Sequence, residues 1–181
     1  MPRESTPLVR KSGFLEAEKF YVLAYEGDVT EKKYFEDLRQ SPMFNNSGSI
    51  ETIPLKKERN AGNSPLDVKK LLSKAKAEYN FRATDEFWLI LHLRKLEDIA
   101  DGDREKILEN EKVSVKHNYI DLYLADCIGD GRGYTKRPKA SVFMPRVKVA
   151  IENARKIRDL GERIPGGLST DVYKLVEKLI K

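Results

Sequence analysis

Residues 20–38 read FYVLAYEGDVTEKKYFEDL, and this stretch decides the fold. Its opening run, residues 20–25, is apolar throughout rather than alternating, which predicts a strand that is buried on both faces. Thr30 is a good N-cap residue, and the apolar residues after it recur at helical spacing as far as Leu38. The stretch therefore predicts a buried strand, a turn that begins with Glu26, and a helix.

The alternation of strands and helices continues as far as residue 93. Residues 50–55 (IETIPL) and 86–93 (EFWLILHL) have the apolar character of two further strands. Between them, residues 64–67 (SPLD) form a capping box with proline at the first helical position, which predicts a helix to about Tyr79. We therefore expect an α/β fold with a small, mainly parallel sheet of about three to four strands joined by crossover helices.

The rest of the chain has helical rather than strand character. Residues 1–17 are polar with two prolines and are expected to form a loosely ordered N-terminal segment. Residues 18–181 are expected to form one domain, with a βαβαβ part over 18–93 and a helical part over 94–181. The helices expected in the second part cover residues 103–110, 116–127, 144–160 and 170–180, the last with Ser169 as its N-cap.

Composition excludes several classes of protein. The chain has 181 residues, of which 40% are hydrophobic and 35% charged, as is typical of a soluble globular domain. No apolar run is long enough to cross a bilayer, and the N-terminus lacks the apolar core of a signal peptide. The single cysteine, Cys127, cannot form an internal disulfide, which favours the cytoplasm. One cysteine and two histidines also make a zinc site improbable.

The positive charge is concentrated in one part of the chain. The net charge is +5, and residues 130–163 hold ten Lys or Arg against four Asp or Glu. A concentrated basic stretch is typical of a surface that faces phosphate, although a solvated helix and loop would look the same. The residues selected as candidate nucleic-acid contacts are Lys56, Lys57 and Arg59 after the second strand, and Arg132, Lys136, Arg137 and Lys139 in the later basic loop.

Glu26 is the main candidate for chemistry. Ligands of open α/β sheets bind beyond the carboxyl ends of the strands, and the helix start beside Glu26 favours anions. Glu26 is therefore either a carboxylate that holds Mg²⁺ or moves a proton, or simply the first solvated residue after a strand. Glu31 is either a second carboxylate of the same site, beside Glu26, or an ordinary acid in the first turn of a helix. His92, at the end of the third strand, is either an acid/base or a histidine satisfied by a backbone carbonyl.

The stretch YEGDVTEKKYFEDL resembles the opening motif of the RloB-like family, an apolar strand followed by E-G-x-x-T-E-x-x-Y-F-x-x-L. Residues 87–92 (FWLILH) and 168–179 (LSTDVYKLVEKL) resemble two further segments of that family, in the same order. The resemblance implies a Toprim-like fold, Mg²⁺-dependent phosphodiester chemistry, and a role in bacterial defence against phage beside an ATPase partner. It also implies that Glu26 is the metal ligand or general base.

The sequence departs from the pattern of this family at one important place. The Asp-x-Asp pair that completes the Mg²⁺ site in Toprim-like folds is missing, and residues 92–95 (HLRK) follow the third strand instead. Asp101 and Asp103 have the correct spacing but are better explained as the start of a helix. Two functions therefore stay open: a metal-dependent nuclease, or a shortened, inactive member that binds nucleic acid or docks on an ATPase. A poorly folding remnant is a third alternative.

Overall fold

The computed structural model describes residues 18–27, 30–46, 50–55, 62–116, 141, 144–157 and 170–181. The elements in chain order are β1 (Lys19–Tyr25), α1 (Thr30–Gln40), β2 (Ile50–Pro54), α2 (Pro65–Glu78), β3 (Glu86–His92), α3 (Leu93–Glu97), α4 (Asp101–Asn110), β4 (Lys112–Lys116), the 3₁₀ turn η1 (Met144–Arg146), α7 (Val147–Ile157) and α8 (Val172–Leu179). None of these described helices is both long enough and apolar enough to span a membrane.

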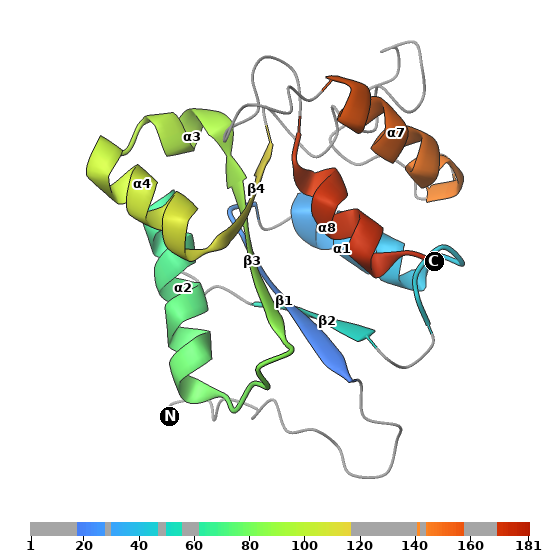
Figure 1. Cartoon of the computed structure of the whole chain (residues 1–181), viewed down its shortest axis with the longest axis horizontal. Coiled ribbons are helices and arrows are strands. Elements are labelled where there is room, and N and C mark those ends of the chain that lie inside the picture. Colours follow the sequence, from blue (N-terminus) through green and yellow to red (C-terminus); the bar gives the residue numbers. More distant parts are fainter. Residues whose placement is uncertain are drawn as a thin grey trace.

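The strands form one four-stranded sheet in the order β2-β1-β3-β4, with every neighbouring pair parallel. The central pair is β1 and β3, in a register that sets Leu23 beside Trp88. Parallel neighbours need crossover connections, and α1, α2 and the α3–α4 pair supply them (Figure 1). The expected α/β fold with a small parallel sheet is confirmed.

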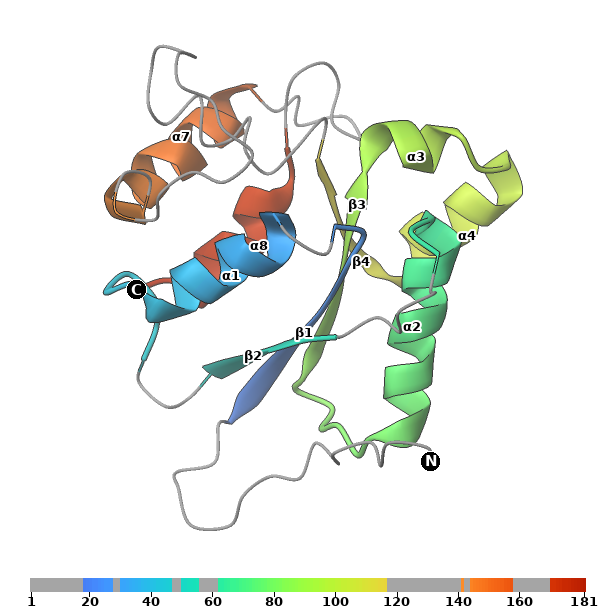
Figure 2. The ribbon, with the colours of Figure 1, turned by 180° about the vertical axis from the view of Figure 1, so that it is seen from behind.

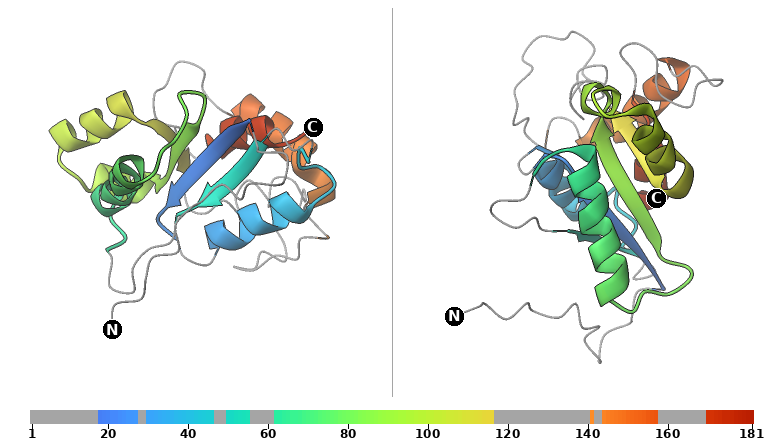
Figure 3. Two further views of the ribbon diagram at one scale, coloured as in Figure 1. Left: turned by 90° about the horizontal axis from the view of Figure 1, so that it is seen from below. Right: turned by 90° about the vertical axis from the view of Figure 1, so that its left-hand side faces the viewer.

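Helices cover both faces of the sheet. On one face α1, α7 and α8 pack over Leu23, Trp88 and Ile90, and on the other face α2, α3 and α4 pack over Val22 and Leu89 (Figures 1 and 2). Figure 3 shows the sheet between these two groups of helices, seen from below and from one side. Successive side chains of a strand point to opposite faces, so the continuous apolar run of β1 fills both cores, as predicted.

The start of α2 shows how local sequence fixes an element. Ser64 Oγ accepts a hydrogen bond from the Asp67 backbone N–H at 3.2 Å, and the Asp67 carboxylate accepts one from the Ser64 N–H at 3.3 Å. Pro65 occupies the first helical position, where its missing N–H costs nothing. The predicted capping box is therefore confirmed.

The described residues after position 93 are mainly helical, as predicted, but they also contain the strand β4, which was not predicted from the sequence. A helix was predicted over residues 116–127, but its first residue, Lys116, is the last residue of β4. Residues 117–127 lie outside the described residues. Val113 and Val115 alternate with Ser114 in KVSVK, and Val115 is buried in the core beneath α4. β-Branched residues at period two favour a strand.

The C-terminal helices lie close to their predicted positions. α7 covers Val147–Ile157, and α4 covers the predicted 103–110 segment with two more residues at its start. α8 begins at Val172 with Asp171 as its N-cap, so the prediction of Ser169 as N-cap is wrong. The reason is that Thr170 forms an antiparallel bridge with Lys116, which keeps the backbone extended until Asp171.

Candidate site at the carboxyl edge of the sheet

Glu26 follows the last residue of β1 and is buried, with 4% of its surface exposed. Its Oε1 accepts a hydrogen bond from the His92 backbone N–H at 3.2 Å, and its Oε2 lies 3.4 Å from Lys95 Nζ. Burial raises the pKa of Glu26, while the His92 N–H and the ammonium groups of Lys95 and Lys116 oppose that rise. Glu26 is therefore not the solvated residue that one interpretation of the sequence proposed.

Lys95 comes from α3, the short helix that continues directly from β3. Its ammonium group donates to the Asn63 backbone carbonyl at 2.9 Å and also faces the Glu26 carboxylate. The side chain is about half exposed, at 46%, so one side of the ammonium group meets solvent. Lys95 thus links α3, the loop before α2 and the end of β1.

Glu31 and Lys116 form a buried ion pair, and Lys116 also acts electrostatically on Glu26. Glu31 lies in the first turn of α1, Lys116 ends β4, and each side chain is no more than 4% exposed. Gly27 packs directly against the Glu31 carboxylate, and a Cβ at this position would collide with it. Because Lys116 opposes part of the rise that burial causes in the pKa of Glu26, its ammonium group acts on both carboxylates.

His92 serves as the N-cap of α3. Its Nδ1 accepts a hydrogen bond from the Arg94 backbone N–H at 3.2 Å, so in this arrangement the proton of the neutral ring is on Nε2. The partner of Nδ1 is therefore the backbone N–H of Arg94. The geometry gives His92 a capping role, and its predicted acid/base role stays a prediction.

The described residues do not fit a Mg²⁺ site. Mg²⁺ prefers a shell of oxygen ligands that includes carboxylates. Within the described ranges no three His, Cys, Asp or Glu side chains come together as metal ligands would. Each of the two buried carboxylates instead faces an ammonium group, Glu31 that of Lys116 and Glu26 that of Lys95. The donor set at this edge therefore suits neutralisation by lysine rather than coordination of a divalent ion.

Asp101 and Asp103 lie in the first turn of α4, at the start of a helix as the sequence predicted. Asp101 pairs with Arg104 at 2.5 Å, and Asp103 lies 3.8 Å from Lys106. Both pairs are local to the helix.

The structure brings together the three predicted catalytic residues, Glu26, Glu31 and His92, at the carboxyl edge. Sequence reasoning missed Lys95 and Lys116, which are the residues that neutralise the carboxylates. Lys116 was missed together with its strand, whose signal was the alternating KVSVK pattern. The predicted nucleic-acid contacts all lie outside the described residues: Lys56, Lys57, Arg59, Arg132, Lys136, Arg137 and Lys139.

Other basic side chains of the described part are exposed on α3, η1 and α7. Arg94, next to Lys95 in α3, is exposed. Figures 1 and 2 show α7 at the level of α3, toward the end of the sheet at which β3 and β4 finish. η1 and α7 contribute exposed Arg146, Lys148 and Lys156. At the carboxyl edge, exposed Arg94 and half-exposed Lys95 of α3 lie beside the buried, paired carboxylate of Glu26.

Comparison of the chain with protein families, with curated proteins and with solved structures gives no match. The chemistry of the carboxyl edge is therefore the basis for a function.

Proposed function

We propose that the chain is a nucleic-acid-binding protein of the RloB-like, Toprim-related kind, which holds a phosphodiester backbone at the carboxyl edge without cutting it. The observation that carries this proposal is the neutralisation of both buried carboxylates, Glu31 by Lys116 and Glu26 by Lys95. A carboxylate that already faces an ammonium group has little attraction left for a divalent ion. It also repels an incoming phosphate less than an isolated carboxylate would.

Exposed cations of α3, which lies at this edge, and of α7, which lies at the level of α3 (Figure 1), supply the attraction for phosphate. Arg94 and Lys95 project from α3, and Lys148 and Lys156 from α7, all with exposed side chains. Lys and Arg contacts to phosphate provide affinity that is independent of sequence and falls as salt is added. The carboxyl edge is also where open parallel sheets bind their ligands.

The biological setting is proposed on the resemblance alone. An RloB-like protein would act in bacterial defence against phage, with an ATPase as its partner. In that setting a shortened member would recognise nucleic acid, and the cutting would fall to another component.

A metal-dependent nuclease is the second candidate, and one observation favours it. Burial raises the pKa of Glu26, and perturbed carboxyl groups at a sheet edge are concentrated in functional sites. The two candidates differ in what Glu26 does, so a substitution at this residue separates them.

The test measures binding and cleavage on the same samples. Single- and double-stranded DNA and RNA are incubated with the protein in Mg²⁺ or Mn²⁺, and binding is followed by fluorescence anisotropy over a range of salt concentrations. We expect salt-dependent binding, no cleavage by either wild type or Glu26→Gln, and weaker binding by Arg94→Gln/Lys148→Gln.

Lys70→Gln/Lys74→Gln is the matched control for two lost charges, because both side chains are exposed on α2. Absence of binding, or binding that is insensitive to salt and to the double substitution, would contradict the proposal. Cleavage by wild type that disappears in Glu26→Gln would establish the second candidate instead.

A further inference from the structure

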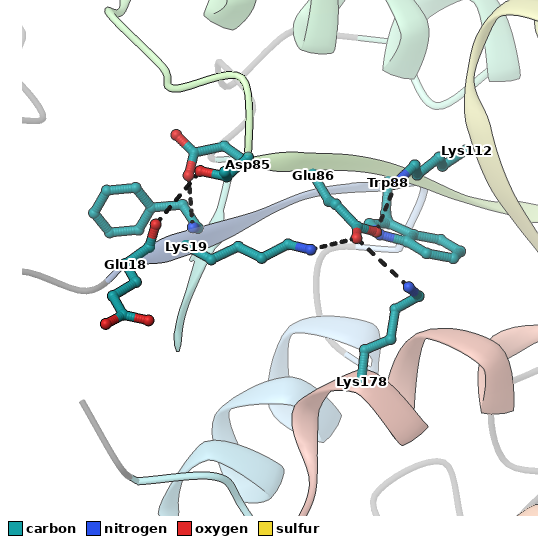
Figure 4. Close-up of polar contacts among 9 residues, drawn as sticks. Glu18, Lys19, Asp85, Glu86, Trp88, Lys112 and Lys178 are labelled. Atoms are coloured by element: carbon teal, nitrogen blue, oxygen red, sulfur yellow. Dashed lines mark hydrogen bonds and ion pairs between the residues drawn. The ribbon is translucent and has the colours of Figure 1, made fainter. Parts of the chain in front are cut away.

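A second charged cluster lies at the opposite, amino edge of the sheet, around Glu86. Glu86 is the first residue of β3 and is 7% exposed. Its Oε1 lies 2.6 Å from Lys19 Nζ and 3.5 Å from Lys178 Nζ. Its Oε2 lies 2.8 Å from Lys112 Nζ and accepts a hydrogen bond from the indole N–H of Trp88 at 3.0 Å. Figure 4 shows these side chains converging on the one carboxylate.

The three lysines come from three different elements. Lys19 begins β1, Lys112 begins β4, and Lys178 lies in the last turn of α8. We call Lys19, Lys112 and Lys178 with Glu86 the amino-edge lysine cluster. Because the three ammonium groups contact one buried carboxylate, the fold fixes them close together rather than leaving them as separate surface charges.

Glu86 remains ionised in this environment. Burial would raise the pKa of its carboxyl group, but the hydrogen bonds from Lys112, Lys19 and Trp88 outweigh burial and lower the pKa to about 2. The carboxylate therefore supplies one full negative charge at neutral pH. Within the described part of the chain, Glu86 is the only acidic side chain in ion-pair contact with any of the three lysines.

The cluster therefore has an excess of two positive charges. The lysine side chains are partly open to solvent, with exposures of 30% for Lys19, 53% for Lys112 and 43% for Lys178. Each ammonium group has three N–H donors, and contact with Glu86 leaves donors of each group for another acceptor. An anion at this position would meet several ammonium groups at once.

We propose that the amino-edge lysine cluster binds a phosphate monoester as its dianion. A phosphate monoester carries close to two negative charges at neutral pH, which matches the excess of the cluster, and offers three acceptor oxygens. A phosphodiester, with one negative charge, would leave the cluster positively charged. The ligand is therefore a terminal phosphate, either on a free small molecule or at the end of a nucleic acid. This site is at the other edge of the sheet and does not depend on the proposed function.

The protein contains its own reporter for this site. Trp88 is the only tryptophan of the chain, and its indole N–H contacts the Glu86 carboxylate. An anion that draws the lysines toward itself changes the charge around the indole ring, so binding is expected to alter Trp88 fluorescence. The titration uses inorganic phosphate at constant ionic strength, with chloride as the balancing salt, on the full chain.

We expect saturable binding by wild type, and a dissociation constant at least tenfold higher for Lys112→Gln/Lys178→Gln. The control variant Lys70→Gln/Lys74→Gln, which also removes two charges but from the exposed side of α2, should bind as wild type does. Thermal melting confirms that each variant is folded. If the double variant does not fold, Lys112→Gln alone serves, since this lysine is the most exposed of the three.

A second titration identifies the source of the phosphate. Tighter binding of a 5′-phosphorylated oligonucleotide than of its 5′-hydroxyl counterpart, with the difference lost in the double variant, supports the proposal and assigns the ligand to a nucleic-acid end. Equal binding of the two oligonucleotides beside saturable inorganic phosphate assigns it to a free phosphate compound. The proposal is overturned if phosphate changes neither Trp88 fluorescence nor its own ³¹P linewidth, or if the double variant binds it as wild type does.

Discussion

Ionisation of the Glu26 carboxyl group is unfavourable in the folded protein, because the group is buried. Its position at the end of an apolar strand was clear from the sequence, because Phe20–Tyr25 could only be a buried strand and a parallel sheet brings the ends of such strands to one edge. Its burial and its partners were not predictable, since they depend on the backbone of His92 and on Lys95, which arrive from distant parts of the sequence.

Replacing Glu26 by Gln is expected to leave the protein as stable as wild type or to raise its free energy of unfolding by up to about 1 kcal/mol at pH 7. Glutamine still accepts the His92 N–H but carries no buried charge. Folding raises the pKa of Glu26. The stability of wild type relative to the variant is therefore greatest below the ordinary pKa of a glutamate, and it falls as the pH rises through the pKa of Glu26 in the folded protein. Urea unfolding at pH 4 to 8 measures the difference, and a variant that is much less stable at pH 7 would disprove this description.

At the scale of elements, β4 and α1 are joined through the Glu31–Lys116 ion pair. Sequence reasoning identified α1, but it assigned Lys116 to a helix, and this one error concealed the partner of Glu31. A five-residue edge strand with two valines is a weak pattern, and β3 and the Thr170 bridge decide its conformation. Short strands depend more on their neighbours than on their own residues.

Lys116→Met is expected to lower the free energy of unfolding by about 3 kcal/mol, because it leaves the Glu31 carboxylate buried without its ammonium partner. The double variant Glu31→Leu/Lys116→Met removes both charges and should recover most of the loss. Chemical denaturation of the two single variants and the double variant gives the coupling energy directly. Additive effects of the two substitutions would show that the pair is not coupled.

At the scale of the whole molecule, the sheet has clusters of paired charges at both edges and apolar cores on both faces. The parallel pairing and the crossover helices follow from the alternation of apolar strands and helices, and the sequence predicted both. The order of the strands in the sheet was not predicted. The charged clusters did not follow, because each one gathers residues from elements far apart in the chain. Glu86 and its three lysines come from β1, β3, β4 and α8, and no local sequence pattern predicts that these side chains contact one another.

The Glu86 cluster should make the stability of the whole fold sensitive to acid. Since folding lowers the pKa of Glu86 from 4.5 to about 2, its contribution is fully present above pH 4.5 and is lost as pH falls toward 2. After allowance for the solvent around the lysines, Glu86→Gln is expected to cost about 1–2 kcal/mol at pH 7. The gap between wild type and variant should narrow steadily in urea unfolding below pH 4.5, whereas a gap that is constant from pH 7 to pH 2.5 would argue against this role.

The central claim is that lysines, rather than a divalent ion, neutralise the carboxylates at the carboxyl edge. Calorimetric titration of Mn²⁺ into the nucleic-acid-free protein tests it most directly. Wild type and Glu26→Gln should give the same trace, with no saturable heat that depends on Glu26. Saturable Mn²⁺ binding by wild type that is lost in Glu26→Gln would contradict the claim.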